Sequence, residues 1–345
     1  MTNMRRHSFL LLAAILASGI LRAQTPALQL IFSSTHSMNA VTVSRDGRIF
    51  VNFPDSKELG DADDPALAEI DKEGKAHPYP DSAWNAWKKS NDSSHAFVRV
   101  NTMRMGPDGN LWVVDSGRKE NAPARLIVID LHTNRVIRII SLENGTTAGS
   151  YVDDLRFHNQ FVFLTDAGDP ALIVVNLETG KQRRVLEHDK STTAMRAMYA
   201  DGKIMMWQGK ELRIHADQLE VSPDGKLLYF QPASGPMYSI ATDLLENSTI
   251  SGQQLKESVE LFADTPTTGG TAINSNGDIY LSDVNRLRIL RIDPKGSITT
   301  FLDDKRLGWT DAMWITEEGY LWLPATRHKI GPSHETLSVI YKVKL

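Results

Sequence analysis

A hairpin pattern recurs along this chain of 345 residues and limits the folds that it can adopt. Each copy has an alternating strand, a short turn that ends in glycine, and a second strand rich in aromatic and β-branched residues. A sixth copy, from Leu155, has a shorter turn without glycine. The copies recur at roughly 40 to 65 residues, a period typical of repeat architectures. The five turn glycines are Gly47, Gly109, Gly225, Gly277 and Gly319.

A second pair of turn-linked strands follows most of these hairpins, which gives about four strands per unit. Six such units predict an all-β fold, a six-bladed β-propeller in which each antiparallel sheet buries its faces against its neighbours. The last unit supplies only three strands. We therefore predict that residues 28–32 join the C-terminal blade and close the ring. A β-sandwich is the alternative, but it does not explain six similar hairpins. Helical periodicity is weak, apart from the N-terminus and short segments such as residues 81–88.

The N-terminus has the pattern of an export signal. Arg5 and Arg6 precede an apolar run, residues 9–21, and Ala23 offers a cleavage point. We predict a signal peptide over residues 1–23 and a single propeller domain over residues 24–345, secreted or periplasmic and free of the membrane after cleavage. The run is short for a membrane span, and an uncleaved anchor is the alternative. The chain has no cysteine, which excludes disulfides and thiolate chemistry.

The charge pattern and the absence of common motifs exclude several functions. The 38 basic and 42 acidic residues are mixed along the chain, with a net charge of −4, so no basic face for nucleic acid is expected. The sequence contains no GxSxG elbow, P-loop or dinucleotide fingerprint, and its histidines lack the spacing of a metal motif such as HExxH.

A ring of polar residues is predicted at the propeller axis. The position eight residues before each turn glycine should begin the innermost strand of a blade, where all blades converge. Five of the six copies carry a carboxylate or an amide there, and Gly269 occupies the remaining position. An oxygen-only cluster of this kind suits a hard cation, calcium above all, or a cationic amine. The predicted ring consists of Asn39, Asn101, Asp153 or Asp154, Asp217 and Asp311.

A second polar layer follows on the next strand of the blades. The position six residues after the glycine, with its counterpart in the irregular copy, holds Asp115, Asp166, Gln231 and Asp283. Carboxylates at strand ends commonly accept hydrogen bonds from loop N–H groups. We therefore expect the outer aspartates to be structural and the inner ring to be functional.

Several segments resemble the yellow and major royal jelly protein family, in its bacterial branch: LWVVDSG from Leu111, LTDAGDPALIVVNLETGKQRRVLEHDKS from Leu164, LEVSPDGKLLYFQP from Leu219 and PYPDSAWNAW from Pro78. The resemblance covers nearly the whole mature chain. It implies a secreted six-bladed propeller that binds small ligands, which are biogenic amines in some insect salivary proteins.

The chain is also distantly similar to the gluconolactonase and senescence marker protein group, which hydrolyses sugar lactones with a divalent metal in its central tunnel. Asp311 in TDAM resembles the metal-binding aspartate of the group's PDGM motif. Asp153 or Asp154 stands where the group has a ligand asparagine, and Asn101 where it has a pocket asparagine. The sequence departs from the group at Thr310 and Ala312, and it shows no clear counterpart of the N-terminal glutamate ligand.

Three functions follow from these patterns. The first is a non-enzymatic propeller that binds a small ligand, such as a cation or an amine, through Asn39, Asn101, Asp153 and Asp217. The alternative is a calcium-dependent sugar-lactone hydrolase with a metal held by Asp154, Asp217 and Asp311, where calcium polarises the lactone carbonyl and Asp217 or Asp311 activates water. The third is a scaffold that binds a protein partner through residues 55–64.

Other side chains are weaker candidates. Trp84 and Trp87 are expected to pack a long loop onto the rim rather than to stack on a ligand. Arg196, Arg327 and His328 are either part of a pocket mouth or, by default, part of a solvated rim.

Overall fold

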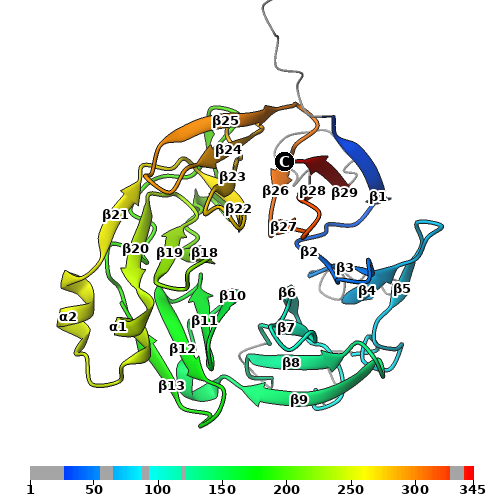
Figure 1. The fold of residues 1–345 in the computed structure, drawn as a ribbon, viewed down its shortest axis with the longest axis horizontal. Helices are drawn as coiled ribbons and strands as arrows, with labels where there is room; N and C mark the ends of the chain where they lie inside the picture. The colour runs from blue at the N-terminus through cyan, green and yellow to red at the C-terminus, as the bar shows by residue number, and fades with distance from the viewer. Residues whose placement is uncertain (1–26, 55–64, 88–92, 118–121, 327–337) are drawn as a thin grey trace, which may run out of the picture.

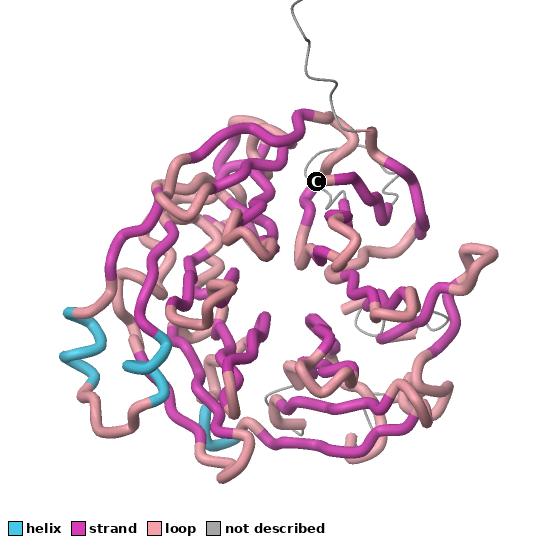
Figure 2. Tube along the Cα trace, in the orientation of Figure 1, coloured by secondary structure: helices cyan, strands magenta, loops and turns pink. Residues whose placement is uncertain are grey.

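The protein is a ring of six small sheets around a central axis (Figure 1), as the hairpin repeat predicts. The trace consists almost entirely of strands and loops (Figure 2). Within the described residues no helix is both long and apolar enough to cross a membrane. The predicted signal peptide, residues 1–23, lies outside the described part of the chain. The computed structural model describes residues 27–54, 65–87, 93–117, 122–326 and 338–345.

The first three blades are four-stranded antiparallel sheets whose strands pair in chain order. Blade 1 contains β2 (Val41–Val43), β3 (Ile49–Asn52), β4 (Leu67–Ile70) and β5 (Ala76–Pro78). Blade 2 contains β6 (Val100–Met105), β7 (Leu111–Asp115), β8 (Arg125–Asp130) and β9 (Arg135–Ser141). Blade 3 contains β10 (Val152–His158), β11 (Phe161–Asp166), β12 (Ala171–Asn176) and β13 (Gln182–Val185).

The next two blades repeat this order, and the sixth differs in its innermost strand. Blade 4 contains β18 (Ala216–Val221), β19 (Leu227–Pro232), β20 (Met237–Ala241) and β21 (Glu260–Ala263). Blade 5 contains β22 (Thr268–Ile273), β23 (Ile279–Asp283), β24 (Arg288–Ile292) and β25 (Ile298–Asp303). Blade 6 contains β26 (Trp309–Thr310), β27 (Trp314–Ile315), β28 (Tyr320–Thr326), β29 (Ser338–Lys344) and β1 (Gln29–Ser34).

The N-terminal strand closes the ring, which confirms the sequence prediction. β1 is antiparallel to β29, with Gln29 opposite Lys342 and Ser34 opposite Ser338. The outermost strand of blade 6 therefore comes from the opposite end of the chain. This pairing covers an edge that would otherwise be open to solvent.

The hairpin turns explain the repeated glycine. All five predicted turn glycines have a positive φ, between +73° and +86°, where a Cβ atom would be strained. In the irregular copy of blade 3 Asn159 takes this role, with a φ of 50°. Asparagine tolerates the left-handed region better than most residues, which is why this copy turns without a glycine.

Apolar clusters fill the spaces between neighbouring blades. Phe163 of blade 3 packs with Phe230 of blade 4, and Trp322 of blade 6 packs with Val51 of blade 1. Similar clusters join the other four neighbouring pairs. Each strand alternates its side chains between two such interfaces, so every sheet is covered on both faces. The core is thus divided among the blade interfaces, which leaves the axis to polar residues.

Several elements lie outside the repeat and were not predicted. Two short hairpins follow blade 3: β14 (Tyr199–Ala200) with β15 (Lys203–Ile204), and β16 (Met206–Trp207) with β17 (Lys210–Glu211). The helices α1 (Thr242–Glu246) and α2 (Gly252–Glu257) join β20 to β21, and a 3₁₀ turn, η1 (Glu143–Gly145), precedes blade 3. Ser251 caps α2 by accepting a hydrogen bond from the backbone N–H of Gln254.

The periodicity of residues 81–88 does not form a helix in the described residues of this segment, which are turns and bends. Trp84 packs against Phe97, with ring centroids 5.2 Å apart, and Trp87 is buried in a small apolar cluster. These contacts place both tryptophans in the packing of a loop against the ring, as the sequence predicts.

Candidate functional site: a polar ring at the propeller axis

Irregularities in the innermost strands carry the predicted ring residues. The pairing of β6 with β7 shifts at Asn101, that of β10 with β11 at Asp153 and Asp154, and that of β18 with β19 at Asp217. β22 has a similar shift at Gly269 and Gly270. A β-bulge inserts an extra residue and changes the direction of its side chain. At the bulges, the side chains of these residues therefore need not follow the alternation between the two faces of the sheet.

Asp311 lies in a gap between two short strands of blade 6, not at the start of one strand as the hairpin pattern suggested. β26 ends at Thr310 and β27 begins at Trp314. In the gap Ala312 forms a parallel bridge with Ala40, and its N–H donates to the carbonyl of Asn39 over 3.1 Å. Blades 6 and 1 are therefore joined directly beside the axis.

Hydrogen bonds connect the amide side of the ring. The side chain of Asn39 donates to the carbonyl of Asn101 over 2.9 Å. The side chain of Asn101 donates to the carbonyl of Asp153 over 3.1 Å and also to its carboxylate. The hydroxyl of Tyr151 donates to the side-chain oxygen of Asn101. The structure thus brings the predicted residues of blades 1, 2 and 3 together in one chain of contacts.

Asn52 holds the backbone beside Asn39 and Asn101 in place, and no sequence pattern predicted this role. Its side chain is fully buried, accepts from the N–H of Ala40 over 2.8 Å, and donates to the carbonyls of Val100 and Asn101. It stands at the end of β3, five residues after the turn glycine Gly47. A buried amide with all its bonds made fixes the relative position of blades 1 and 2.

The carboxyl side of the ring contains three aspartates that repel one another. Burial, and next the charge of Asp153, raise the pKa values of Asp217 and Asp311 well above their usual range. Burial raises the pKa of Asp153 to about 6, although a hydrogen bond with Asp217 opposes the shift. Like charges held in a poorly solvated place favour the protonated form. At neutral pH, in the absence of a cation, protons therefore compensate part of this charge.

Polar neighbours orient two of these carboxyl groups. The indole N–H of Trp309 donates to Asp311 over 2.9 Å. The side chain of Gln218 donates to Asp217 and accepts from Gln231 over 3.0 Å. Gln231, predicted as part of the outer layer, thus supports the ring through Gln218.

Asp154 differs sharply from its neighbour Asp153. Its carboxylate accepts from Arg104 over 2.7 Å and from Arg156 over 2.8 Å. Burial opposes ionisation, but these two guanidinium groups outweigh it and lower the pKa of Asp154 to about 2. Arg156 also pairs with Glu220 over 2.7 Å. Two arginines thus already neutralise the charge of Asp154. We therefore do not include Asp154 among the residues available to a ligand, and its role as a metal ligand stays a prediction.

The outer aspartates form ion pairs within their blades. Asp115 pairs with Arg125 over 2.8 Å and accepts from the backbone N–H groups of residues 98 and 99. Asp166 pairs with Arg184, and Asp283 pairs with Arg288, each over 2.8 Å. These contacts tie the end of the second strand to a later strand of the same blade. The structural role expected for these aspartates is confirmed.

The donor set of the ring suits a hard cation chemically, because it offers only oxygen. Even so, within the described residues no group of three or more His, Asp or Glu side chains is arranged to hold one metal ion. Asp153 and Asp217 share a hydrogen bond, so one of the two carboxyl groups carries the proton between them. The predicted metal residues therefore do not form a ready calcium site, and no reaction step is assigned to a metal.

The two hairpins after blade 3 extend toward blades 5 and 6. The N–H of Tyr199 donates to Thr267 over 2.8 Å, and that of Gly202 donates to Asn285 over 2.8 Å. Met198 shares an apolar cluster with Trp309, the tryptophan that donates to Asp311. This segment therefore borders the polar ring. Its length, compared with the other blade connections, is the sequence signal that marks it.

Of the other candidates, Arg196 pairs with Asp264 over 2.6 Å, and both side chains are exposed, as on a solvated rim. Arg327, His328 and the loop of residues 55–64 lie outside the described residues. Their predicted roles stay predictions.

Fold and site together define a six-bladed β-propeller with a polar cluster at its axis. The model of the major royal jelly protein family matches residues 102–333, which is more than half of the chain, and the protein belongs to this family. A search of curated protein sequences finds no match.

Solved structures with the same fold share little sequence with this chain. A gluconolactonase from Xanthomonas campestris has a TM-score of 0.58 at 12% identity, over 93% of this chain and 89% of its own. A calcium-binding regucalcin from Agrobacterium tumefaciens has a TM-score of 0.57 at 13% identity, over 93% and 95%. Virginiamycin B lyase from Staphylococcus aureus has a TM-score of 0.55 at 12% identity, over 93% and 99%. At this level of identity the likeness concerns the fold alone.

Proposed function

We propose that the protein binds a small cationic ligand, an organic amine, at the polar ring. The observation that carries this proposal is the contrast between the two layers of aspartates. Each outer aspartate has an arginine partner, whereas in the described part of the chain no ion pair is formed by Asp153, Asp217 or Asp311. Charge that the described residues leave without an ion-pair partner is suited to a ligand of opposite sign.

An ammonium group fits the chemistry of this site. It offers three N–H donors, and the ring offers carboxylate oxygens from three blades together with the amide oxygens of Asn39 and Asn101. The raised pKa values mean that these carboxyl groups retain protons to a higher pH than usual, and a bound cation would displace those protons. Binding is therefore expected to release protons and to strengthen as the pH rises through about 6.

Isothermal titration calorimetry tests this proposal with benzylamine and, as an uncharged counterpart, benzyl alcohol. We expect saturable binding of the amine and none of the alcohol. Affinity should increase from pH 5 to pH 8, and the heat should depend on the buffer because protons are released. Asp311→Asn should weaken binding, and Asp283→Asn, which removes an outer carboxylate, should leave it unchanged. Equal binding of amine and alcohol would refute a charge-selective site.

A calcium-dependent sugar-lactone hydrolase is the second candidate. Two of the similar structures are a gluconolactonase and a calcium-binding regucalcin, and the oxygen donors of the ring suit calcium chemically. In this reading Asp217 and Asp311 would hold the ion and act on the substrate. Calorimetric titration of chelator-treated protein with calcium chloride, followed by a lactone panel, separates the two. Hydrolysis that needs calcium and is lost in Asp311→Asn would favour the hydrolase.

We also propose that the protein is exported and processed. The support is the basic and apolar pattern of residues 5–23 in the sequence. N-terminal sequencing of the protein recovered from the periplasm or medium should begin near Gln24. Recovery of the intact N-terminus in the membrane fraction would instead support an uncleaved anchor.

A further inference from the structure

A cavity of about 470 Å³ lies at the end of the axis away from the polar ring. Its lining comes from the last residues of the innermost strands and from the hairpin turns that follow, such as Met105, Ile273 and Glu317. The ring residues stand at the beginnings of the same strands, so the two sites lie at opposite ends of the innermost strands. All six blades contribute to the lining. The volume lies in the range of small-molecule sites.

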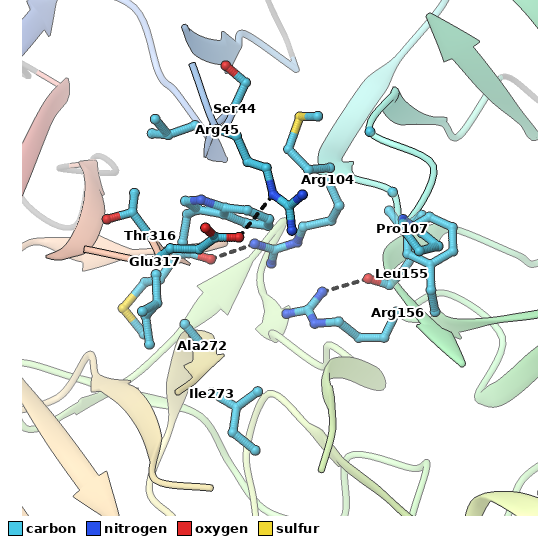
Figure 3. A pocket seen from close by; sticks show the side chains of 18 of the residues that line it. Ser44, Arg45, Arg104, Pro107, Leu155, Arg156, Ala272, Ile273, Thr316 and Glu317 are labelled. Carbon is cyan, nitrogen blue, oxygen red and sulfur yellow. Dashed lines mark hydrogen bonds and ion pairs between the residues drawn. The ribbon is translucent and has the colours of Figure 1, made fainter. Parts of the chain in front are cut away.

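Two largely buried arginines provide hydrogen-bond donors to this cavity. Figure 3 shows the guanidinium groups of Arg104 and Arg156 projecting into its centre from neighbouring blades. Their side chains are only 3% and 13% exposed. Asp154, which pairs with both, does not line the cavity and so lies behind them. Asp154 therefore fixes the two groups from behind and leaves their other edges toward the cavity.

Hydrogen bonds to described residues do not use all the N–H groups of Arg104 and Arg156. Hydrogen bonds to described residues use three of the five N–H groups of Arg104, through Asp154 and the carbonyl of Met313. Arg156 uses four of its five, through Asp154, Glu220 and its neighbour Leu155. A buried donor without an acceptor is costly, so the remaining N–H groups favour a ligand that offers an acceptor oxygen.

The charges around these donors balance, and the rest of the lining is mainly apolar. Arg104 and Arg156 are matched by Asp154 and Glu220, so an ion would meet no net opposite charge. Apolar lining comes from several blades, including Leu155, Phe157, Ile273, Trp314 and Ile315. At the mouth Arg45 pairs with Glu317 over 3.0 Å, but both side chains are exposed, and such a pair contributes little and opens easily.

We propose that this cavity is a second ligand site, which binds an uncharged and largely apolar small molecule through a carbonyl oxygen that accepts from Arg104 and Arg156. Its body lies against the apolar walls, and its carbonyl group points along the axis toward the ring. The site is independent of the amine site proposed above, because the ionic network of Arg104, Asp154 and Arg156 stands between them.

Fluorescence titration with prodan tests this proposal. Prodan is an uncharged naphthalene ketone whose emission shifts to the blue in apolar surroundings. We expect saturable binding with a blue shift, and binding roughly tenfold weaker for dimethylaminonaphthalene, the analogue without the ketone. Ile273→Trp fills the cavity from its lining and should weaken prodan binding by at least roughly tenfold. Ile298→Trp, an exposed position on β25 of the same blade, is the matched control and should bind as the wild type does.

The same titration contains the results that would overturn the proposal. Equal affinity in the wild type and in Ile273→Trp would place the probe elsewhere. Equal affinity for prodan and its ketone-free analogue would refute the proposal that Arg104 and Arg156 donate to a carbonyl oxygen of the ligand. Asp153→Asn should bind prodan normally, since it alters only the ring. Loss of prodan binding in that variant would mean that the two sites are one, whereas failure of amine binding alone would leave the cavity untouched.

Discussion

Replacing Asp153 by asparagine should make the protein more stable at pH 8 while it weakens the binding of a cation. The folded-state pKa of Asp153 is raised from 3.8 to about 6. A shift of about two units corresponds to about 3 kcal/mol of unfavourable ionisation at a pH above both values. Asparagine keeps the acceptor for Asn101 and carries no charge. The variant therefore loses the repulsion and keeps the main hydrogen bond.

The sign of the pH dependence follows from the raised pKa. The protonated Asp153 contributes fully to stability below pH 3.8, and this contribution is lost as the pH rises through about 6. The variant cannot lose it. The difference in free energy of unfolding between variant and wild type should thus be near zero at pH 4 and reach about 1 to 3 kcal/mol in favour of the variant at pH 8. Urea unfolding at the two pH values measures it.

A matched aspartate gives the opposite result. Asp283 accepts from Arg288 over 2.8 Å and from the N–H of Arg286 over 3.2 Å. Asp283→Asn should destabilise the protein by about 1 to 3 kcal/mol at pH 8, because a buried charged hydrogen bond is lost. It should leave benzylamine binding unchanged. If Asp153→Asn were as destabilising at pH 8 as Asp283→Asn, the charge of Asp153 would stabilise the fold. That result would refute the prediction that this charge reduces stability.

Three further changes test separate parts of the structure. Deleting residues 27–34 removes β1 from the edge of β29, so the melting temperature should fall sharply, as differential scanning calorimetry would show; an unchanged value would mean that the strand does not close the ring. Arg125→Met leaves the fully buried Asp115 without its cation, and urea unfolding should show a loss of about 3 to 5 kcal/mol. Trp309→Phe removes a hydrogen bond that lowers the pKa of Asp311, so benzylamine should bind more weakly at pH 7 and with a smaller deficit at pH 9.

The sequence predicted those features of the fold that depend on local patterns. Alternation and turn glycines are visible within each hairpin, and they led to the six blades and to the closing strand at residues 28–32. The helices α1 and α2 and the hairpins β14 to β17 were missed, because they are insertions that break the repeat. For example, β16 and β17 are strands of two residues each, too short for any periodicity to be recognised.

The candidate site was predicted less completely, because the direction of its side chains depends on pairing between strands. Asp153 and Asp154 were interchangeable in the sequence. The bulge in β10 separates them, and the partners that distinguish them are distant in the chain: Arg104 for Asp154 and Asp217 for Asp153. Asn52 gave no signal because its role lies in holding blade 1 to blade 2, which no local pattern encodes.

The contrast between these two adjacent aspartates argues that the ring is kept for a ligand. Asp154 has a pKa of about 2 and joins blade 3 to blade 2 through Arg104, so its charge contributes to stability. Asp153 has a pKa of about 6, and its charge reduces stability at neutral pH. A cost of about 3 kcal/mol is a large fraction of the free energy of unfolding of a typical domain. A residue that costs stability where asparagine would not is explained if its charge acts on a group that the described part of the chain does not supply, and a cation at the axis meets that requirement.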